Sequence, residues 1–546
     1  MPRVSRRTVL RSLGVGAAGA AAATGYELAG GSGTRTTARP PSLRSGLHTA
    51  RNPGPSLPSR RILDENARRG SDSWKIGASG TRPATDVAME IKGYASKTSV
   101  HVGESIDFHA SVAGGERFAV DVFRFGHYGG VGARLLASST WLRGVRQAAP
   151  NLDPVAGTIT CAWQPSWTLK VPSSWISGLY LAVLTTTTGY RSYAPFVVRD
   201  DRPAKLLVVV PFTTYQAYNQ FPLDGRLGKS LYYGYPPAEA GSVPPPVATP
   251  STPPDGLTAP SPHDPTAIAY EHRARHVSFD RPYAMAGMPK HAGDDQAFVW
   301  WAEQLGYDIT YATSLDLHGG DLDLDRYVGV VFSGHDEYWS KPMRDRVTAA
   351  VMSGTSLAYL SANNVYWHIR VDAPTVAGEA RSMHCYKTDA DPAPDASGPT
   401  TLWRSMPSAP THAEQGLLGV QYDGIVEAEV PLIVTHAEHW VWRGAGVRDG
   451  DAIPRVVGVE ADGFNAAMPR PAGATQTLLS ASPFTYTSTR QQKTQNTSVC
   501  EMPSGATIFV AGTMNWPLAL GEPGRIDPRI QTATANVLTR MLGGST

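Results

Sequence analysis

Two patterns of apolar residues divide the chain. From residue 88 onward, short runs alternate apolar and polar residues, as in FAVDVFRF at 118–125, and Gly-rich turns separate the runs. Alternation with period two is typical of strands with one buried face, so residues 85–199 are predicted to form an antiparallel β-sandwich. From residue 203 the apolar runs are continuous, beginning with LLVVV at 206–210, and they alternate with helical segments. Strands buried on both faces are typical of parallel sheets, which predicts a doubly wound α/β domain over residues 203–546.

Three segments lack both patterns. Residues 1–28 contain SRRTVL at positions 5–10, followed by a Gly- and Ala-rich run shorter than the roughly 20 apolar residues that span a bilayer. This is the pattern of a twin-arginine signal segment, so we expect an exported protein without a membrane span. The Arg-, Ser- and Pro-rich residues 29–84 are expected to form a disordered linker, and the Pro-rich residues 236–264 an exposed insertion.

Composition and motifs give no support for several classes of function. The formal net charge is only +2, so charge gives no reason to expect a nucleic-acid partner. The three cysteines show neither a disulfide framework nor metal-ligand spacing. The sequence has no GxSxG, HExxH, Walker A or CxxC motif, so the common nucleophile, zinc, nucleotide and redox sites are not indicated.

The most informative stretch is VGVVFSGHDEYWS, at residues 328–340. Its apolar run ends at Ser333 and is followed at once by His335 and Glu337, with Pro342 in the first turn of a predicted helix. In open α/β sheets ligands bind in the crevice outside the carboxyl ends of the strands. We therefore expect both side chains to point into a site from a sharp strand-to-helix turn. The alternative is a surface turn with solvated carboxylates.

Other predicted strands deliver tyrosines and an amide to the same edge. Tyr218 follows the predicted strand at 206–210, and Asn363 follows the predicted strand at 357–361. Tyr283 is the last residue of the segment VSFDRPY. Phenolate and carboxylate oxygens are hard anionic ligands that favour trivalent iron over zinc. Taken alone, each tyrosine is better explained as a core or rim aromatic, so the iron hypothesis rests on the whole set.

These segments resemble the large (β) subunit of N,N-dimethylformamidase and its relatives, from about residue 93 to the C-terminus. In the first domain the resemblance rests on GYAS at 93–96 and VFRFGHYGGVGAR at 122–134. In the second it rests on TYQAYN, SFDRPY, GHDEYW and ANNVYW, in consistent order. The resemblance implies a sandwich followed by a glutamine-amidotransferase-like α/β domain.

In the resembled enzyme two tyrosines and a glutamate hold a mononuclear ferric iron, Fe(III). Matched motif by motif, the resemblance implies Glu337 and Tyr218 as metal ligands, with Tyr283 as the second tyrosine and Tyr232 as the alternative to it. The resembled enzyme also has a small partner subunit. The expected assembly is therefore either a complex with such a subunit or a homo-oligomer.

The resemblance implies an exported iron-dependent amidohydrolase that cleaves a C–N bond in a formamide or another small amide. His335 and Asn363 match positions that flank the iron. His335, expected to be partly accessible, would be a general base or proton shuttle, and Asn363 a hydrogen-bond donor to a developing oxyanion. The alternative is a secreted carbohydrate- or cell-wall-binding protein with an inactive α/β domain, whose ligand platform would be the aromatic residues 123–128.

Overall fold

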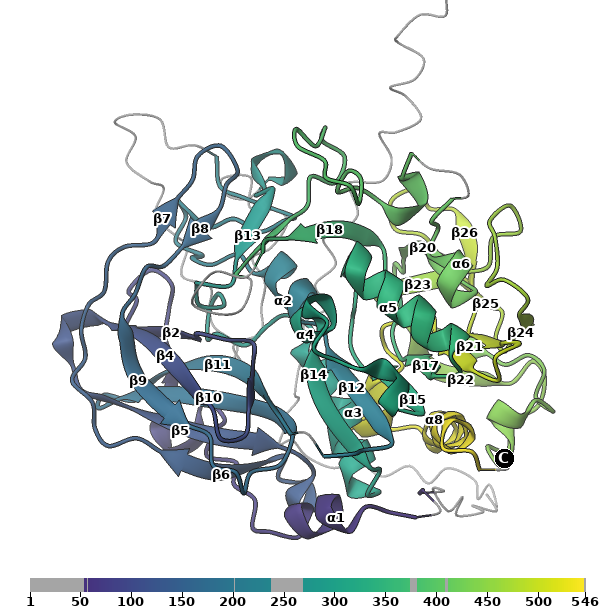
Figure 1. Cartoon of the computed structure of the whole chain (residues 1–546), viewed down its shortest axis with the longest axis horizontal. Coiled ribbons are helices and arrows are strands. Elements are labelled where there is room, and N and C mark those ends of the chain that lie inside the picture. The colour runs from purple at the N-terminus through teal and green to yellow at the C-terminus, as the bar shows by residue number, and fades with distance from the viewer. Residues whose placement is uncertain are drawn as a thin grey trace, which may run out of the picture.

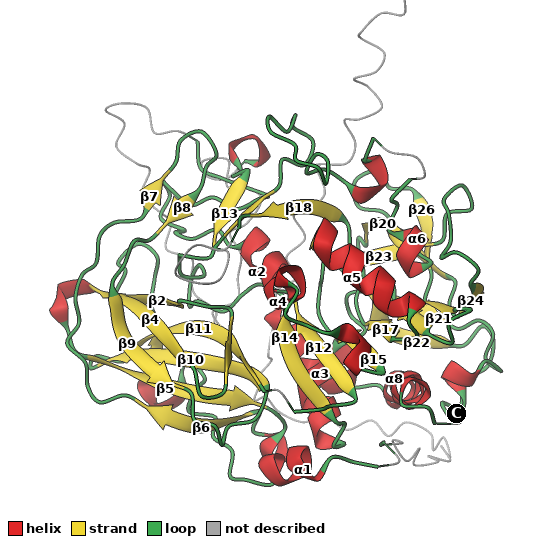
Figure 2. Ribbon diagram, in the orientation of Figure 1, coloured by secondary structure: helices red, strands yellow, loops and turns green. Residues whose placement is uncertain are grey.

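The structure, a computed structural model, describes residues 54–55, 57–200, 202–236, 269–373, 381–407 and 411–544. Over these residues the chain is multidomain and rich in β-strands, with eight α-helices. The strands of a first unit and the sheet of a second lie side by side in Figure 1, and Figure 2 shows that the helices gather mainly around the second unit. The predicted signal segment and most of the predicted insertion lie outside the described residues.

The first unit is a β-sandwich built from a six-stranded and a three-stranded sheet. Apolar side chains of both sheets, among them Phe108, Val120 and Phe196, meet in one core. The strands that the alternating pattern predicts are present, because each contributes side chains to this core. The larger sheet contains β1 (Arg82–Pro83), β3 (Ser99–His101), β5 (Phe118–Phe125), β6 (Ala133–Ser138), β10 (Gly178–Thr186) and β11 (Tyr190–Arg199); the smaller contains β2 (Ile91–Ala95), β4 (Ser105–Val112) and β9 (Pro165–Lys170).

The aromatic stretch at the end of β5 is buried. Phe123, Phe125 and Tyr128 are only 1%, 3% and 2% exposed, and the two phenylalanines join a core shared with the second unit. These rings therefore cannot form the exposed ligand platform that the binding-protein alternative required. That expectation is wrong because the outer face of the larger sheet is covered by the second unit and not by solvent.

The second unit is organised around a seven-stranded mixed sheet. Its strands follow the order β14-β12-β15-β17-β28-β27-β24. The first five are parallel to their neighbours, and the last two are antiparallel. The strands are β12 (Leu206–Val210), β14 (Ile309–Thr313), β15 (Gly329–Phe332), β17 (Ser356–Tyr359), β24 (Thr475–Leu478), β27 (Ser498–Glu501) and β28 (Thr507–Val510).

Helices pack on both faces of this sheet, because strands such as β12 and β15 carry no polar side chain on either face. Val208 of β12 packs in one core with Phe298 of α3 and Leu538 of α8. Val209, the next residue, packs in another core with Val347 of α5. The helices are α1 (Arg60–Asn66), α2 (Phe212–Tyr218), α3 (Ala292–Gln304), α4 (Ser314–Gly319), α5 (Lys341–Met352), α6 (Gln415–Leu418), α7 (Leu518–Gly521) and α8 (Pro528–Met541).

Smaller sheets surround the carboxyl end of the mixed sheet and its antiparallel edge. One has four strands, β13 (His276–Ser278), β19 (Ser382–His384), β18 (Trp367–Val371) and β16 (Tyr338–Ser340). The others are pairs: β7 (Asn151–Leu152) with β8 (Ile159–Thr160), β20 (Gln421–Ile425) with β23 (Glu460–Gly463), β21 (Val430–Ile433) with β22 (Ala452–Val457), and β25 (Ser482–Thr485) with β26 (Gln492–Gln495).

A buried ion pair joins the two units. Arg124 of β5 and Glu303 of α3 have side chains that are 0% exposed, and the guanidinium meets both carboxylate oxygens at 2.7 and 2.8 Å. Tyr311 of β14 donates a further hydrogen bond to Glu303 at 2.8 Å. A bidentate pair without solvent fixes geometry more strongly than a surface pair does.

The predicted linker is ordered in part, so the expectation of disorder over residues 29–84 is wrong for its C-terminal portion. Helix α1 buries Ile62, which is 1% exposed. Asn66 at the end of α1 donates to Glu303 at 2.8 Å and accepts from the backbone N–H of His127 at 2.6 Å. The segment is polar because its side chains satisfy the ion pair between the units, and that role leaves no apolar periodicity to detect.

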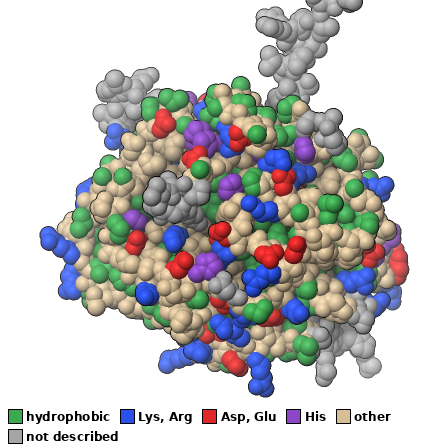
Figure 3. All heavy atoms as spheres, viewed as in Figure 1, with side chains coloured by type: hydrophobic (Ala, Val, Ile, Leu, Met, Phe, Trp, Pro, Cys, Tyr) green, Lys and Arg blue, Asp and Glu red, His purple; other side chains and the backbone are tan. Residues whose placement is uncertain are grey.

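Among the described residues no helix is long and apolar enough to cross a membrane. Lysine and arginine side chains are interspersed with acidic ones over the face seen in Figure 3, in keeping with the formal net charge of +2.

Candidate metal centre

The candidate site lies at the carboxyl ends of three neighbouring parallel strands of the mixed sheet. Strand β12 leads into α2, whose last residue is Tyr218; β15 leads into the loop that carries His335 and Glu337; β17 leads into the loop that carries Asn363. The carboxyl ends of parallel strands meet at the same edge, so these loops converge. The sequence therefore predicted correctly which loops come together.

The turn after β15 is longer than predicted. The short strand β16 separates Glu337 from α5, which begins at Lys341 with Ser340 as its N-cap and Pro342 in its first turn. The backbone N–H of Glu337 is held at 2.9 Å by the hydroxyl of Thr214 from α2. Glu337 is 1% exposed, so the alternative of a solvated surface turn is wrong.

Two tyrosine hydroxyls converge on the carboxylate of Glu337. Tyr218 Oη lies 2.9 Å from Glu337 Oε2, and Tyr232 Oη lies 2.5 Å from Glu337 Oε1. The two hydroxyl oxygens are 3.2 Å apart, and the rings stack with centroids separated by 4.5 Å. Three oxygen-bearing side chains thus meet within hydrogen-bonding distance of one another in a buried place.

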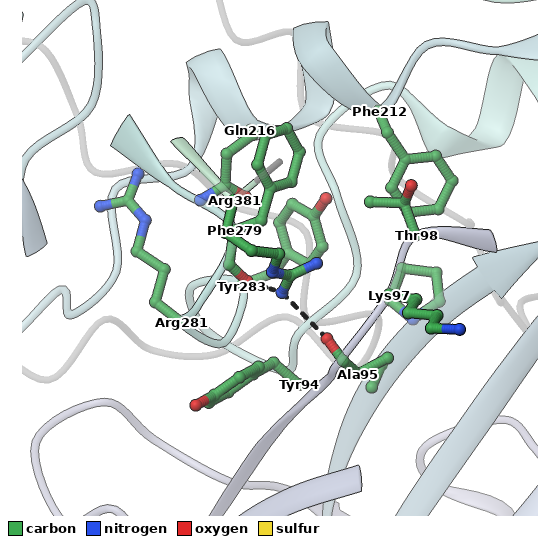
Figure 4. Close-up of a pocket in the computed structure, with 12 residues that line it drawn as sticks. Tyr94, Ala95, Lys97, Thr98, Phe212, Gln216, Phe279, Arg281, Tyr283 and Arg381 are labelled. Carbon is green, nitrogen blue, oxygen red and sulfur yellow. Dashed lines mark hydrogen bonds between the residues drawn. The ribbon is translucent and has the colours of Figure 1, made fainter. Parts of the chain in front are cut away.

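The second tyrosine beside Glu337 is Tyr232 and not Tyr283, so the preference for Tyr283 is corrected. Tyr283 lines a separate cavity between the sandwich and α2, with Tyr94 and Phe279 among the other lining residues (Figure 4). Tyr232 reaches the site because the backbone N–H of Leu231 donates to Ala217 of α2 at 3.0 Å. This bond lays the segment that carries Tyr232 along α2.

His335 stands in the same site but is not accessible. Its Nε2 lies 3.3 Å from both Tyr218 Oη and Glu337 Oε2, and 3.8 Å from Glu460 Oε2. Its Nδ1 lies 3.1 Å from the backbone carbonyl of Ala362, which orients the ring. The side chain is 1% exposed, so the expectation of partial accessibility is wrong.

Asn363 is held at the site by its backbone and by its amide. Its backbone adopts φ 57°, a left-handed conformation that asparagine tolerates better than most residues. Its N–H donates to Asp462 Oδ1 at 2.8 Å, and Nδ2 donates to Glu460 Oε2 at 3.0 Å. An amide nitrogen carries two hydrogens, so one remains beyond the bond to Glu460.

Sequence reasoning missed several neighbours of the site. Glu460, at the start of β23, contacts both His335 and Asn363, and Lys387 places its ammonium 3.3 Å from the ring centroid of Tyr232. His291, which precedes α3, has its ring centroid 5.4 Å from those of Tyr218 and His335. None of the three stands in a recognisable motif. The positive φ of 67° at His291 is a conformational signal that only the structure reveals.

Burial and neighbouring charges set the protonation of these groups. Burial raises the pKa of Tyr218 and of Tyr232 well above the usual value, and the charge of Glu337 adds to the rise. Burial opposes ionisation of Glu337, but the hydrogen bond and charge of His335, the charge of Lys387 and the hydrogen bond from Tyr232 together hold the pKa of Glu337 below its usual value. Burial lowers the pKa of His335, whereas the bond to Glu337 and the charge of Glu460 raise it to about 9. Without a cation the phenols therefore stay protonated.

The donor set suits a hard trivalent cation. Within the described residues no group of three or more histidine, cysteine, aspartate and glutamate side chains is arranged to hold a metal ion. Tyr218, Tyr232 and Glu337 form a set of another kind, with one carboxylate and two phenols. Once both phenols are ionised, the set carries three negative charges on hard oxygen atoms, and hard oxygen ligands select hard metal ions.

Comparison with known proteins gives matches of low identity among solved structures. No curated protein matches it significantly. Among solved structures, a cycloisomaltooligosaccharide glucanotransferase from Paenibacillus sp., complexed with cycloisomaltoheptaose, is 13% identical over 23% of this chain and 16% of that chain, with a TM-score of 0.15. A superoxide reductase (neelaredoxin) from Ignicoccus hospitalis is 11% identical over 20% of this chain and 82% of that chain, with a TM-score of 0.13. Such low TM-scores support no conclusion about fold or function.

One family covers most of the chain. The family is described as "N,N-dimethylformamidase beta subunit-like, C-terminal", and it matches residues 119–528 of this chain. The match includes the second half of the sandwich and every residue of the site described above. The chain therefore belongs to the N,N-dimethylformamidase beta subunit-like family.

Proposed function

We propose that this protein is an exported, iron-dependent amidohydrolase that cleaves the C–N bond of a formamide or another small amide. The observation that carries the proposal is the convergence of the Tyr218 and Tyr232 hydroxyls on the two oxygens of Glu337, in a buried site beside His335 and Asn363. Membership of the dimethylformamidase-like family supports the same class of substrate.

Tyr218, Tyr232 and Glu337 would hold the ferric ion. Their combined charge of −3 after ionisation balances a trivalent cation, and the raised pKa values of the phenols mean that only a strong cation brings both to the ionised form. A ferric ion bound there would supply a Lewis acid for the amide carbonyl. Burial strengthens that interaction, because a surrounding of low dielectric constant screens it less than bulk water does.

The remaining polar groups would handle hydrogen bonds and protons. The second amide hydrogen of Asn363 would donate to a substrate carbonyl, while the first bonds Glu460. The Glu460 carboxylate would accept the proton of the attacking water, and His335 Nε2, protonated because its pKa is raised to about 9, would donate a proton to the nitrogen of the departing amine. The two groups divide the acid and base roles that the sequence assigned to His335 alone.

We also infer three features of the whole protein. The second unit is of the doubly wound α/β class, since a parallel five-stranded core carries helices on both faces. The pattern SRRTVL at residues 5–10 supports export by the twin-arginine route. The family description refers to a subunit, which supports assembly with a small partner subunit or as a homo-oligomer.

The proposal is tested with full-length protein expressed in the presence of iron. Elemental analysis should find about one iron per chain, and a tyrosinate-to-iron absorption band should accompany it. Amine release should be measured from N,N-dimethylformamide, from other formamides and from simple acetamides. A protein that holds no iron and hydrolyses none of these amides would overturn the proposal.

A further inference from the structure

Two tyrosine rings stand beside the part of the site that solvent reaches. His335 and Glu337 are only 1% exposed, whereas the side chain of Glu460 is 13% exposed. Tyr366 and Tyr422 are partly exposed as well, and their rings meet edge to face with centroids 5.0 Å apart and planes at 62°. Neither ring takes part in the proposed reaction.

Strand pairing places Tyr422 on the same face as Glu460. Strands β20 and β23 are antiparallel neighbours (Figure 1), and Tyr422 stands directly opposite Asp462. Directly opposed residues share a face of a sheet, and so do residues two apart on one strand, such as Glu460 and Asp462. Asp462 accepts a hydrogen bond from the backbone N–H of Asn363 at 2.8 Å, so this face is turned toward the site. Burial, and after it the charge of Glu460, raises the pKa of Tyr422 well above its usual value, which agrees with a phenol close to that carboxylate.

Tyr366 belongs to the loop that carries Asn363. Its backbone N–H donates to the carbonyl of Glu337 at 2.9 Å, which ties the end of this loop to the site. Its ring contacts that of Trp367 with centroids 5.0 Å apart, in addition to that of Tyr422. A loop and a strand pair that are distant in sequence thus bring two aromatic rings together beside the site.

An ion pair holds both tyrosines in place. The guanidinium of Arg404 meets the carboxylate of Glu414 at 2.9 and 3.2 Å, and Glu414 is 0% exposed. Another nitrogen of Arg404 donates to the backbone carbonyl of Tyr422 at 3.1 Å, and its Cζ lies 5.3 Å from the ring centroid of Tyr366. Arg404 is therefore a positioning residue for the two rings. Because the rings are held in advance, a ligand that contacts them loses little free energy in ordering them.

The charges around the rings favour a neutral aromatic partner over a cation. Aromatic rings attract other planar rings through stacked or edge-to-face contacts, and they attract cations through their faces. One face of Tyr366 already lies under Arg404, and the exposed Lys290 places its ammonium 4.8 Å from the ring centroid of Tyr218. Both positive charges would repel a further cation. A neutral aryl group gains the ring contact, which corresponds to about 2- to 12-fold in affinity beyond the burial of its apolar surface.

We propose that Tyr366 and Tyr422 form a binding surface for an aromatic ring of the substrate, so that the enzyme prefers small amides that carry an aryl group. The inference rests on the proposed amidohydrolase function and narrows its substrate class. The aryl group is attached either to the nitrogen, as in formanilide, or to the acyl carbon, as in benzamide. In both cases the ring lies against the two tyrosines while the amide lies at Asn363 and Glu460.

The test compares aryl amides with cyclohexyl amides of similar size. Formanilide is paired with N-cyclohexylformamide, and benzamide with cyclohexanecarboxamide. The ratio of kcat/KM within each pair is measured with full-length protein expressed in the presence of iron. A change in this ratio between variants is free of the difference in intrinsic reactivity, because that difference is the same in every variant. Affinity for the same amides is measured with the metal-free protein by NMR titration, since the ring contact does not require the metal.

Tyr366→Leu and Tyr422→Leu each remove one ring, whereas Tyr366→Phe and Tyr422→Phe keep it. We expect each Leu variant to lower the aryl-to-cyclohexyl ratio about 5-fold for at least one pair, in kcat/KM and in affinity, and each Phe variant to keep the ratio. Tyr190→Leu is the matched control, because Tyr190 of the sandwich is also partly exposed and lies under an arginine, Arg82, at 4.1 Å. It should leave the ratio as it is in the wild type. Circular dichroism of the metal-free proteins shows whether each variant folds.

The outcomes separate this inference from the proposed function. If the wild type hydrolyses amides and folded Leu variants keep the wild-type ratios, the aromatic binding surface is wrong although the proposed function stands. If the wild type hydrolyses no amide, but the metal-free protein prefers aryl amides and the Leu variants lose that preference, the proposed function fails while the binding surface stands. A wild type that shows neither hydrolysis nor preference overturns both. If neither Leu variant folds, photolabelling of the wild type with an azide-bearing formanilide decides: label on the peptides that carry Tyr366 and Tyr422 supports the inference, and label only elsewhere contradicts it.

Discussion

At the scale of single residues, Glu337 is the group on which the site depends. Both tyrosine hydroxyls and His335 lie within 3.3 Å of its oxygens. Glu337→Gln keeps the shape of the side chain but removes the charge that complements a trivalent cation. We expect ferric-iron affinity to fall at least ~100-fold, the upper end of losses caused by residues that only support a ligand, and amide hydrolysis to fall with it. Elemental analysis after gel filtration and an assay of amine release check both.

The matched control for that variant is Glu438→Gln, which makes the same change at an exposed position. It should leave iron content and hydrolysis as they are in the wild type. A Glu337→Gln protein with full iron content and full activity would show that another residue supplies the carboxylate ligand.

A second prediction at this scale separates the two candidate tyrosines. Tyr232→Phe removes a hydroxyl that lies 2.5 Å from Glu337 Oε1, whereas Tyr283→Phe removes one from the lining of a separate cavity. The first change should weaken the tyrosinate absorption, because only Tyr218 remains as a tyrosine ligand, and should lower iron content strongly. The second should leave the spectrum unchanged. Equal effects of the two changes would contradict the assignment of Tyr232.

At this scale the sequence predicted in large part which side chains lie together. Strand ends and motifs brought out Tyr218, His335, Glu337 and Asn363, and the structure brings these four side chains together. The sequence favoured Tyr283 over Tyr232 as the second tyrosine beside Glu337, and the structure places Tyr232 there instead, because the choice depends on how a loop folds back along α2. Groups such as Glu460 and Lys387 come from segments distant in sequence, and only tertiary packing reveals them.

At the scale of elements, helix α2 positions the loop that carries Glu337. The hydroxyl of Thr214 accepts from the backbone N–H groups of Glu337 and Tyr338 at 2.9 and 3.3 Å. Thr214→Val keeps the shape but leaves these buried N–H groups unpaired, which costs about 1–3 kcal/mol. We expect a lower free energy of unfolding in urea together with weaker iron binding. Thr348→Val, on α5, removes a hydroxyl that bonds only a carbonyl within its own helix and should lose much less.

Elements were predicted best where the pattern was repetitive. The strands of the sandwich alternate apolar and polar residues because mainly one face of each is buried. Strand β12 is continuously apolar because both of its faces are buried. Strand β16 was missed because three buried residues between a loop and a helix, Tyr338–Ser340, give no periodicity to recognise. Helix α1 was missed because its buried residues are partly polar, and they serve a distant ion pair.

At the scale of the whole molecule, the buried pair of Arg124 and Glu303 is one of the contacts that attach the sandwich to the second unit. Both side chains are fully buried, and the pair is joined by Asn66 from α1 and by Tyr311. Charges in such a place are costly to leave alone, because desolvation is not offset once a partner is lost. The sequence predicted the two units but gave no indication of this contact, since its members lie 179 residues apart in the chain.

Replacing one member of the pair should therefore do more harm than replacing both. Glu303→Gln leaves a buried guanidinium without a counter-charge, and we expect the free energy of unfolding to fall by about 3–5 kcal/mol. The double variant Arg124→Met with Glu303→Leu should recover only part of that loss, because it removes the unpaired charge but leaves the buried donors of Asn66 and Tyr311 without their acceptor. Lys341→Met, which breaks an exposed pair with Asp345, should change stability by no more than about 0.5 kcal/mol. Urea denaturation of the metal-free protein measures all three. A double variant that is less stable than Glu303→Gln would contradict this expectation. It would mean that the attraction between Arg124 and Glu303 itself stabilises the contact between the two units.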